Sequence, residues 1–173
     1  LEEALREIIT RHETLRTSFV TNAAKQPIQV VAAPQFNLQV IDLHGDASQE
    51  VQLISDICDR PFDLTQSLLR VHLLRLHEDN YILVIATHHI ISDRWSIGVF
   101  LSELSTLYNA FCNRQSSPLA ELPIQYADWA IWQRQYLQGD VLATQTAYWQ
   151  AQLRTMQLLE LPCDRPRPAN PTY

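Results

Sequence analysis

The most informative segment of the chain is YILVIATHHIISDRWSIGVF, residues 81–100. Its beginning, from Tyr81 to Ala86, is apolar at every position, which is typical of a strand buried on both faces at the centre of a helix-covered sheet. Its end opens an amphipathic helix predicted over residues 96–112, because apolar residues recur there at helical spacing. Ligands bind in such sheets where a strand ends and a helix follows, so we expect a site within residues 87–96.

Strands and helices alternate on both sides of this segment. Upstream, we expect helices over residues 1–12 and 47–59, and strands over residues 15–20, 27–32, 36–42 and 68–76. Asp46 is the predicted N-cap of the second helix, and polar residues 77–80 predict a hairpin between strands 68–76 and 81–88. Downstream, helices are predicted over residues 123–137 and 141–154, with Gly139 ending the first. This order predicts a mixed α/β sandwich, in which helices cover a sheet.

Aromatic residues of the two downstream helices are interpreted as core, because they are spaced for helix packing. They are Trp129, Trp132, Tyr136, Tyr148 and Trp149. Cys58, on the apolar face of helix 47–59, is interpreted in the same way. Four prolines between Pro162 and Pro171 predict an extended connector after the last helix.

Composition narrows the class of protein. The chain has 173 residues, which suits one domain, and its charged share of 18% is below the usual ~25%, so part of its surface is expected to face protein. A net charge of -6 argues against nucleic acid or an anionic membrane as partner, and no apolar run approaches the ~20 residues of a membrane span. Three cysteines without a CxxC pair favour the cytoplasm. The start at Leu1 and the proline-rich end lead us to expect a piece of a longer protein.

Two adjacent histidines and an aspartate stand where the site is expected. Neighbouring residues at a strand end point to opposite faces, so His88 and His89 cannot both face one cleft. One should be structural and the other available for chemistry. Asp93, in the turn that follows, is placed to fix local geometry or to pair with an arginine.

Other chemistries are poorly supported by the residues. No histidine pair has the i,i+4 spacing with a glutamate between that a zinc helix uses, and no cysteine is near, so no metal site is predicted. Ser92 and Ser96 lie outside any GxSxG sequence, which argues against a serine hydrolase. Only three glycines are present, too few for a phosphate-binding loop.

Several segments together resemble one family. Residues 88–96, HHIISDRWS, resemble the HHxxxDGxS motif of condensation domains in nonribosomal peptide synthetases, members of a superfamily with chloramphenicol acetyltransferase. Residues 11–19, RHETLRTSF, resemble the upstream RHExLRTxF motif, and residues 126–132, YADWAIW, resemble the downstream YxDxAxW motif. Pro61-Phe62-Asp63 and residues 161–168 also resemble family segments. All five follow the family's order across nearly the whole chain.

The resemblance implies a fold and a reaction. The fold is the N-terminal lobe of a chloramphenicol acetyltransferase-like α/β sandwich over residues 1–161, truncated at its start, with residues 162–173 as a connector toward a missing C-terminal lobe. Condensation domains join an upstream acyl or peptidyl thioester to the amine of a downstream aminoacyl thioester, forming an amide. Both substrates arrive on phosphopantetheine arms of upstream and downstream carrier proteins. The domain itself binds no cofactor, and an adenylation domain is its neighbour in the synthetase.

The resemblance also implies roles for single residues. His89, the second motif histidine, takes the catalytic role, either as proton acceptor from the attacking amine or as a residue that orients it. Asp93 is expected to act as a scaffold through an ion pair with an arginine rather than in proton transfer. His88, Arg11 and Arg16 are expected to support the site, with Arg16 in a buried ion pair.

Arg94 departs from the family pattern, which has glycine after the motif aspartate. Glycine serves where φ is positive or where a ligand passes close to the backbone. If φ is positive here, Arg94 predicts a shifted turn; if access is the reason, it predicts an obstruction of the pantetheine arm at a tunnel mouth that includes Trp95 and Ser96. The third interpretation is a tolerated variant whose side chain is turned to solvent. We expect Arg94→Gly to raise peptide formation and His89→Ala to remove it.

Two other functions stay open. The first is a catalytically impaired condensation-like module that acts as a carrier-docking or structural unit, because Arg94 replaces the motif glycine. The second is a coenzyme A-dependent acyltransferase of the same superfamily. Such enzymes need only HxxxD, so the RHExLRTxF and YxDxAxW matches favour a condensation domain over this second alternative.

Overall fold

The computed structural model of the chain describes residues 1–43, 47–157, 159, 162 and 164–165. The chain divides into two compact units, Leu1–Trp129 and a second that begins at Ala130. All the candidate site residues belong to the first unit. The predicted N-cap Asp46 and most of the predicted connector 162–173 lie outside the described residues.

The apolar segment that begins at Tyr81 forms one arm of a β-hairpin. β4 (Leu69–His77) and β5 (Asn80–Thr87) pair antiparallel, and β3 (Gln39–Asp42) runs parallel to β4 on its other side. The predicted hairpin is therefore confirmed. The prediction that the Tyr81–Ala86 strand is central is wrong for the described sheet, whose order is β3-β4-β5 and in which only Val84 of β5 is buried. The apolar residues of β5 pack against the helical layers on the two faces of the sheet. Their apolar character does not require a neighbouring strand on each side.

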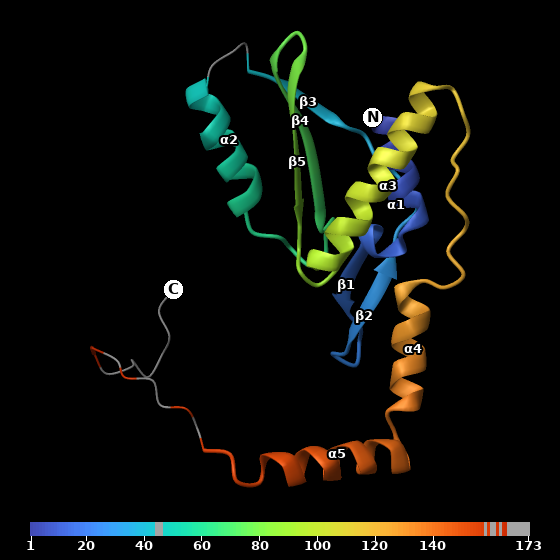
Figure 1. Cartoon of the computed structure of the whole chain (residues 1–173), viewed down its shortest axis with the longest axis vertical. Helices are drawn as coiled ribbons and strands as arrows, with labels where there is room; N and C mark the ends of the chain where they lie inside the picture. Colours follow the sequence, from blue (N-terminus) through green and yellow to red (C-terminus); the bar gives the residue numbers. More distant parts are fainter. Residues whose placement is uncertain (44–46, 158, 160–161, 163, 166–173) are drawn as a thin grey trace. The chain divides into compact units, whose positions relative to one another are not determined.

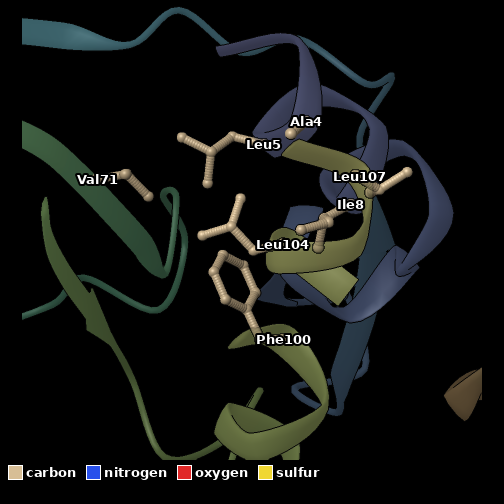
Figure 2. Packing of buried hydrophobic residues seen from close by; sticks show 7 residues of the cluster. All are labelled: Ala4, Leu5, Ile8, Val71, Phe100, Leu104 and Leu107. Carbon is tan, nitrogen blue, oxygen red and sulfur yellow. The ribbon is translucent and has the colours of Figure 1, made fainter. Parts of the chain in front are cut away.

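Helices cover both faces of this sheet, as predicted (Figure 1). α1 (Glu2–Arg11) and α3 (Arg94–Cys112) pack on one face, where a buried cluster joins both helices to β4 (Figure 2): Ala4, Leu5, Ile8, Val71, Phe100, Leu104 and Leu107. α2 (Ala47–Asp59) covers the other face, over a second cluster of Leu43, Ile57, Leu74 and Val84. Side chains alternate along β4, so Val71 enters the first cluster and Leu74 the second.

A separate two-stranded sheet contains the first two predicted strands. β1 (Thr17–Thr21) pairs antiparallel with β2 (Pro27–Val31). Residues Glu13–Arg16 form a 3-10 helix, η1, instead of the first part of a strand. The Thr17 hydroxyl donates to the Glu13 carbonyl at 2.7 Å, which stabilises this turn. The third predicted strand is also shorter than expected, since β3 begins only at Gln39.

Helices α4 (Tyr126–Tyr136) and α5 (Gly139–Leu153) confirm the two predicted downstream helices. Gly139 begins α5 instead of ending the helix before it, and its φ of 53° lies in the left-handed region that glycine adopts without steric cost. The core interpretation of the aromatic residues is wrong, because all five are exposed: Trp129, Trp132, Tyr136, Tyr148 and Trp149. The i,i+4 spacing stacks the Trp132 and Tyr136 rings on one another but does not bury them. Cys58, interpreted as core, is exposed as well.

Candidate active site

A cavity of about 370 Å³ opens at the carboxyl end of β5, within the first unit. Its walls come from the end of β5, the loop that follows, the first turns of α3, the chain around η1, and residues 122–126. Among the lining residues are His12, Thr87, His89, Asp93, Ser96 and Tyr126. The cavity therefore lies where the sequence predicts a site, between the strand and the helix that follows it.

The two motif histidines lie on opposite sides of the sheet. Ile85, Thr87 and His89 alternate along one face and all line the cavity. His88 belongs to the other face, where its ring meets the Phe62 ring edge-on, with the centroids 6.0 Å apart. Only His89 of the pair is placed to meet a ligand in this cavity.

The His89 ring is held by the loop on which it lies. Its Nδ1 is 2.8 Å from the backbone carbonyl oxygen of Ser92. A carbonyl can only accept a hydrogen bond, so Nδ1 carries the hydrogen and, in the neutral ring, Nε2 has the free lone pair. The Ser92 hydroxyl is 2.6 Å from that of Thr87, which closes the loop onto the end of β5. The arrangement presents a basic nitrogen with a fixed tautomer.

Asp93 caps α3. Its Oδ1 accepts from the backbone N–H of Ser96 at 2.8 Å and from the Ser96 hydroxyl at 2.7 Å, while the Asp93 N–H donates to that hydroxyl at 3.3 Å. These reciprocal bonds form a capping box. The Ser96 N–H, and after it the Ser96 hydroxyl, lower the pKa of Asp93 below its ordinary value. This geometry corrects the expectation of an ion pair with an arginine. Among the residues described, no arginine pairs with Asp93.

The two upstream arginines support the walls of the cavity without lining it. Arg11 pairs with Glu103 of α3, with Nε 3.1 Å from Oε1, and donates to the Ala120 carbonyl. Arg16 pairs with Glu13 at 3.3 Å and donates to the Ala32 carbonyl at 2.6 Å, with 16% of its side chain exposed. The expected ion pair of Arg16 is therefore present and partly buried.

Three further residues of the site were not expected from the sequence. His12 lines the cavity and places Nε2 2.6 Å from Oε2 of Glu103, so this carboxylate holds both Arg11 and His12. Gln125 donates to the Arg11 carbonyl at 2.9 Å and accepts from the Glu13 N–H at 3.2 Å. Of the three, Glu103 could have been noticed in the sequence, because it is the only acidic residue in α3.

Arg94 is the first residue of α3, and its backbone does not have a positive φ. The turn around Arg94 therefore carries no left-handed strain, and the conformation at this position does not need glycine. Arg94 is absent from the lining of the His89 cavity and lies beside an adjoining open groove with Gly98 and Ser102. Trp95 lines both the cavity and the groove and is 83% exposed.

A capping box at Asp93 and an ion pair at Asp93 predict different effects of substitution. Asparagine is as good an N-cap as aspartate, whereas alanine is poor. In the complete domain, Asp93→Ala should lower the melting temperature and activity, and Asp93→Asn should keep most of both. If the role of Asp93 required its charge, Asp93→Asn would lower the melting temperature and the activity as much as Asp93→Ala.

The pH dependence of the same cap has a definite sign. The folded-state pKa of Asp93 is depressed, so its stabilising contribution is present above the ordinary aspartate pKa and is lost as the pH falls through the lower folded value. The melting-temperature difference between wild type and Asp93→Asn should therefore change only in acid. It should stay constant from neutral pH down to the ordinary range of aspartate.

The described residues provide neither a metal site nor a membrane-spanning helix. No group of three or more histidine, cysteine, aspartate or glutamate side chains is arranged to hold a metal ion in the described part of the chain. No helix there is long and apolar enough to span a bilayer.

The whole chain, residues 1–173, matches the family model of the condensation domain, and the chain belongs to this family. It is 43% identical over 178 residues to malpinin synthetase of Mortierella alpina, covering 100% of this chain and 2% of that protein. It is 40% identical over 176 residues to chondramide synthase cmdD of Chondromyces crocatus, covering 98% of this chain and 4% of that protein. The relatives are thus very long synthetases, of which this chain matches one short part.

Solved structures show the same fold. The X-domain of teicoplanin biosynthesis, in its complex with OxyB, matches with a TM-score of 0.84 and 30% identity, over 98% of this chain and 38% of that one. A starter condensation domain of rhizomide synthetase RzmA, a mutant, also matches with a TM-score of 0.84, at 21% identity and over 39% of its length, which bears on the fold alone. The described structure is one lobe of the chloramphenicol acetyltransferase-like α/β sandwich, the N-terminal lobe, as predicted.

Proposed function

We propose that this lobe supplies the catalytic histidine for amide formation between two carrier-bound thioesters. The upstream partner is an acyl or peptidyl thioester, and the downstream partner is an aminoacyl thioester with a free amine. The observation that carries the proposal is the His89 ring, which lines the cavity while its Nδ1–H is held by the Ser92 carbonyl. This leaves Nε2 as the hydrogen-bond acceptor for an amine.

The reaction needs one proton to leave the nucleophile. As the amine nitrogen attacks the thioester carbonyl carbon, a C–N bond forms and the nitrogen becomes acidic. Nε2 of His89 accepts a hydrogen bond from this nitrogen, orients it and can take its proton. The C–S bond then breaks, and the proton is returned to the departing thiolate, so the products are an amide and a free thiol. The closed loop from Thr87 to Ser92 keeps the ring in place through both steps.

The walls of the cavity suit a thioester substrate. Ile85, Ile91, Val99 and Phe100 line it, so much of the wall is apolar. An apolar wall excludes water, which would otherwise hydrolyse an acyl thioester. The partners in this proposal are the upstream and downstream carrier proteins with their phosphopantetheine arms, the C-terminal lobe of the same domain and an adjacent adenylation domain.

The test is a reconstitution of the complete domain with both carriers loaded. Mass spectrometry of the downstream carrier should show the amide product, and His89→Ala should abolish it. No product in the presence of both loaded carriers would support the carrier-docking alternative instead. Equal product from an acyl coenzyme A and a free amine would support the coenzyme A alternative.

Arg94 provides a prediction that separates backbone from side-chain effects. Its φ is not positive, so glycine has no conformational advantage over alanine at this position. If the Arg94 side chain hinders a pantetheine arm, Arg94→Gly and Arg94→Ala should raise the rate of amide formation equally, to within about twofold of one another. A gain with glycine alone, measured in the same reconstituted reaction, would show that the backbone limits activity.

A further inference from the structure

We propose that Arg70 is a positioning residue for the reaction, acting through Phe62 and His88 on the loop that holds His89. The inference rests on the proposed function, because it assigns a role in the same reaction. Arg70 lies on β4, opposite Ala86 of β5. Alternation along the hairpin places Arg70 and His88 on the α2 face of the sheet, away from the cavity.

Arg70 binds the end of α2 and the chain beyond it. Its guanidinium donates to three backbone carbonyls: to Ile57 at 3.0 Å, to Arg60 at 2.6 Å and to Pro61 at 2.7 Å. The last carbonyls of a helix have no partner within the helix, and a guanidinium is suited to bind several of them at once because its donors lie in a rigid fork. Arg70 therefore fixes the path of residues 60–62 against the sheet.

The same guanidinium stacks on the Phe62 ring. Its carbon is 3.7 Å from the ring centroid, which is a close cation–π contact. The Phe62 ring also meets the His88 ring at an interplanar angle of 87°, the edge-to-face arrangement that aromatic rings prefer. Phe62 is thus fixed by Arg70 and in turn fixes one face of His88.

His88 defines the turn that presents His89. Its Nδ1 accepts from the backbone N–H of Ile90 at 3.0 Å. Its own N–H donates to the Leu68 carbonyl at 3.0 Å, and its carbonyl accepts from the Ile91 N–H at 3.1 Å. A shift of the His88 ring would release Ile90 and loosen the turn, and the His89 ring would move with it.

This contact path explains why an arginine so far from the ligand side would affect the rate. Arg70 has no access to the cavity, so its effect on catalysis must pass through Phe62 and His88. A misplacement of a catalytic group by about 1 Å can cost up to ~10²-fold in rate. We therefore expect kcat to fall and KM for the aminoacyl carrier to stay unchanged when this path is broken.

The experiment uses the complete domain with both loaded carriers. Phe62→Leu and Arg70→Lys should each lower kcat by about 10- to 10²-fold, with KM for the aminoacyl carrier within about twofold of wild type. Phe62→Tyr keeps the aromatic ring and should therefore retain most of the wild-type kcat. Arg75→Lys is the matched control, because Arg75 lies on the same strand in an exposed ion pair with Asp42, and it should leave kcat unchanged.

A second readout separates positioning from mere loss of stability. Proton–nitrogen NMR spectra of the histidine rings distinguish Nδ1–H from Nε2–H tautomers. In Phe62→Leu the His89 Nδ1–H signal should weaken or broaden, while the melting curve remains cooperative. If Arg70→Lys fails to fold, Phe62→Leu alone decides the question.

The outcomes are distinguishable from a failure of the proposed function. If His89→Ala has no effect, the proposed function is wrong whatever Phe62→Leu does. If His89→Ala abolishes the product but Phe62→Leu keeps the wild-type kcat and the His89 tautomer, the role of Arg70 as a positioning residue is overturned. A rise in KM with kcat unchanged would also overturn it.

Discussion

His89→Ala should lower the rate of amide formation by about 10²- to 10⁴-fold, the usual contribution of a positioned general base. The ring that lines the cavity is lost, and with it the Nε2 lone pair that would accept the proton of the amine. The measurement is single-turnover formation of the amide on the downstream carrier by the complete domain. The melting temperature should change little, because the His89 side chain is exposed.

Ser92→Ala is the matched control for His89→Ala. The His89 ring is held by the backbone carbonyl of Ser92, which alanine retains. Only the hydroxyl contact with Thr87 is lost, so the rate should fall far less than with His89→Ala. If His89→Ala kept more than about a tenth of the wild-type rate, the histidine would serve neither as proton acceptor nor as the main orienting group.

Glu103→Ala should destabilise the complete domain by up to about 3 kcal/mol, the lower end of what is expected when one partner of a buried charge pair is removed, because this pair is only partly buried. The Glu103 side chain is 13% exposed and binds Arg11 and His12 with its two oxygens. Without it, the Arg11 guanidinium, which is 14% exposed, would be left with a charge that water cannot reach well. The free energy of unfolding from urea titration measures the effect.

Glu2→Ala is the control for Glu103→Ala. Glu2 pairs with Arg6 at 2.8 Å, but both side chains are well exposed, so its removal should cost at most about 1 kcal/mol. The loss in free energy of unfolding caused by Glu103→Gln should lie between those of Glu2→Ala and Glu103→Ala, because the amide keeps a hydrogen-bond acceptor without the charge. If Glu2→Ala and Glu103→Ala lowered the free energy of unfolding by similar amounts, the carboxylate of Glu103 would not be an important support of the fold.

Local features of the sequence predicted much of the site. Alternation along a strand was enough to separate His88 from His89, because that rule depends only on neighbouring residues. The capping of α3 by Asp93 was equally local and could have been predicted, since Ser96 stands at the position that completes a capping box. Of the two roles that the sequence left open for Asp93, fixing local geometry or pairing with an arginine, the structure shows the first.

Long-range contacts could not be predicted in the same way. Glu103 and His12 are 91 residues apart, and no periodicity shows which charged group an isolated glutamate will meet. The edge position of β5 and the exposure of Trp132 and Tyr136 were missed for a related reason. Apolar spacing shows which face of an element is suited to burial, but the partner that buries it lies elsewhere.

The amide of Gln125 has a consequence for how the site is assembled during folding. It joins the Arg11 carbonyl and the Glu13 N–H across separations of 114 and 112 residues. Closing so long a loop costs more chain entropy than closing the short β4–β5 hairpin, so the hairpin can form well before this wall. The loop that holds His89 is therefore expected to form first, and the cavity around it to close only when the two distant ends of the first unit meet.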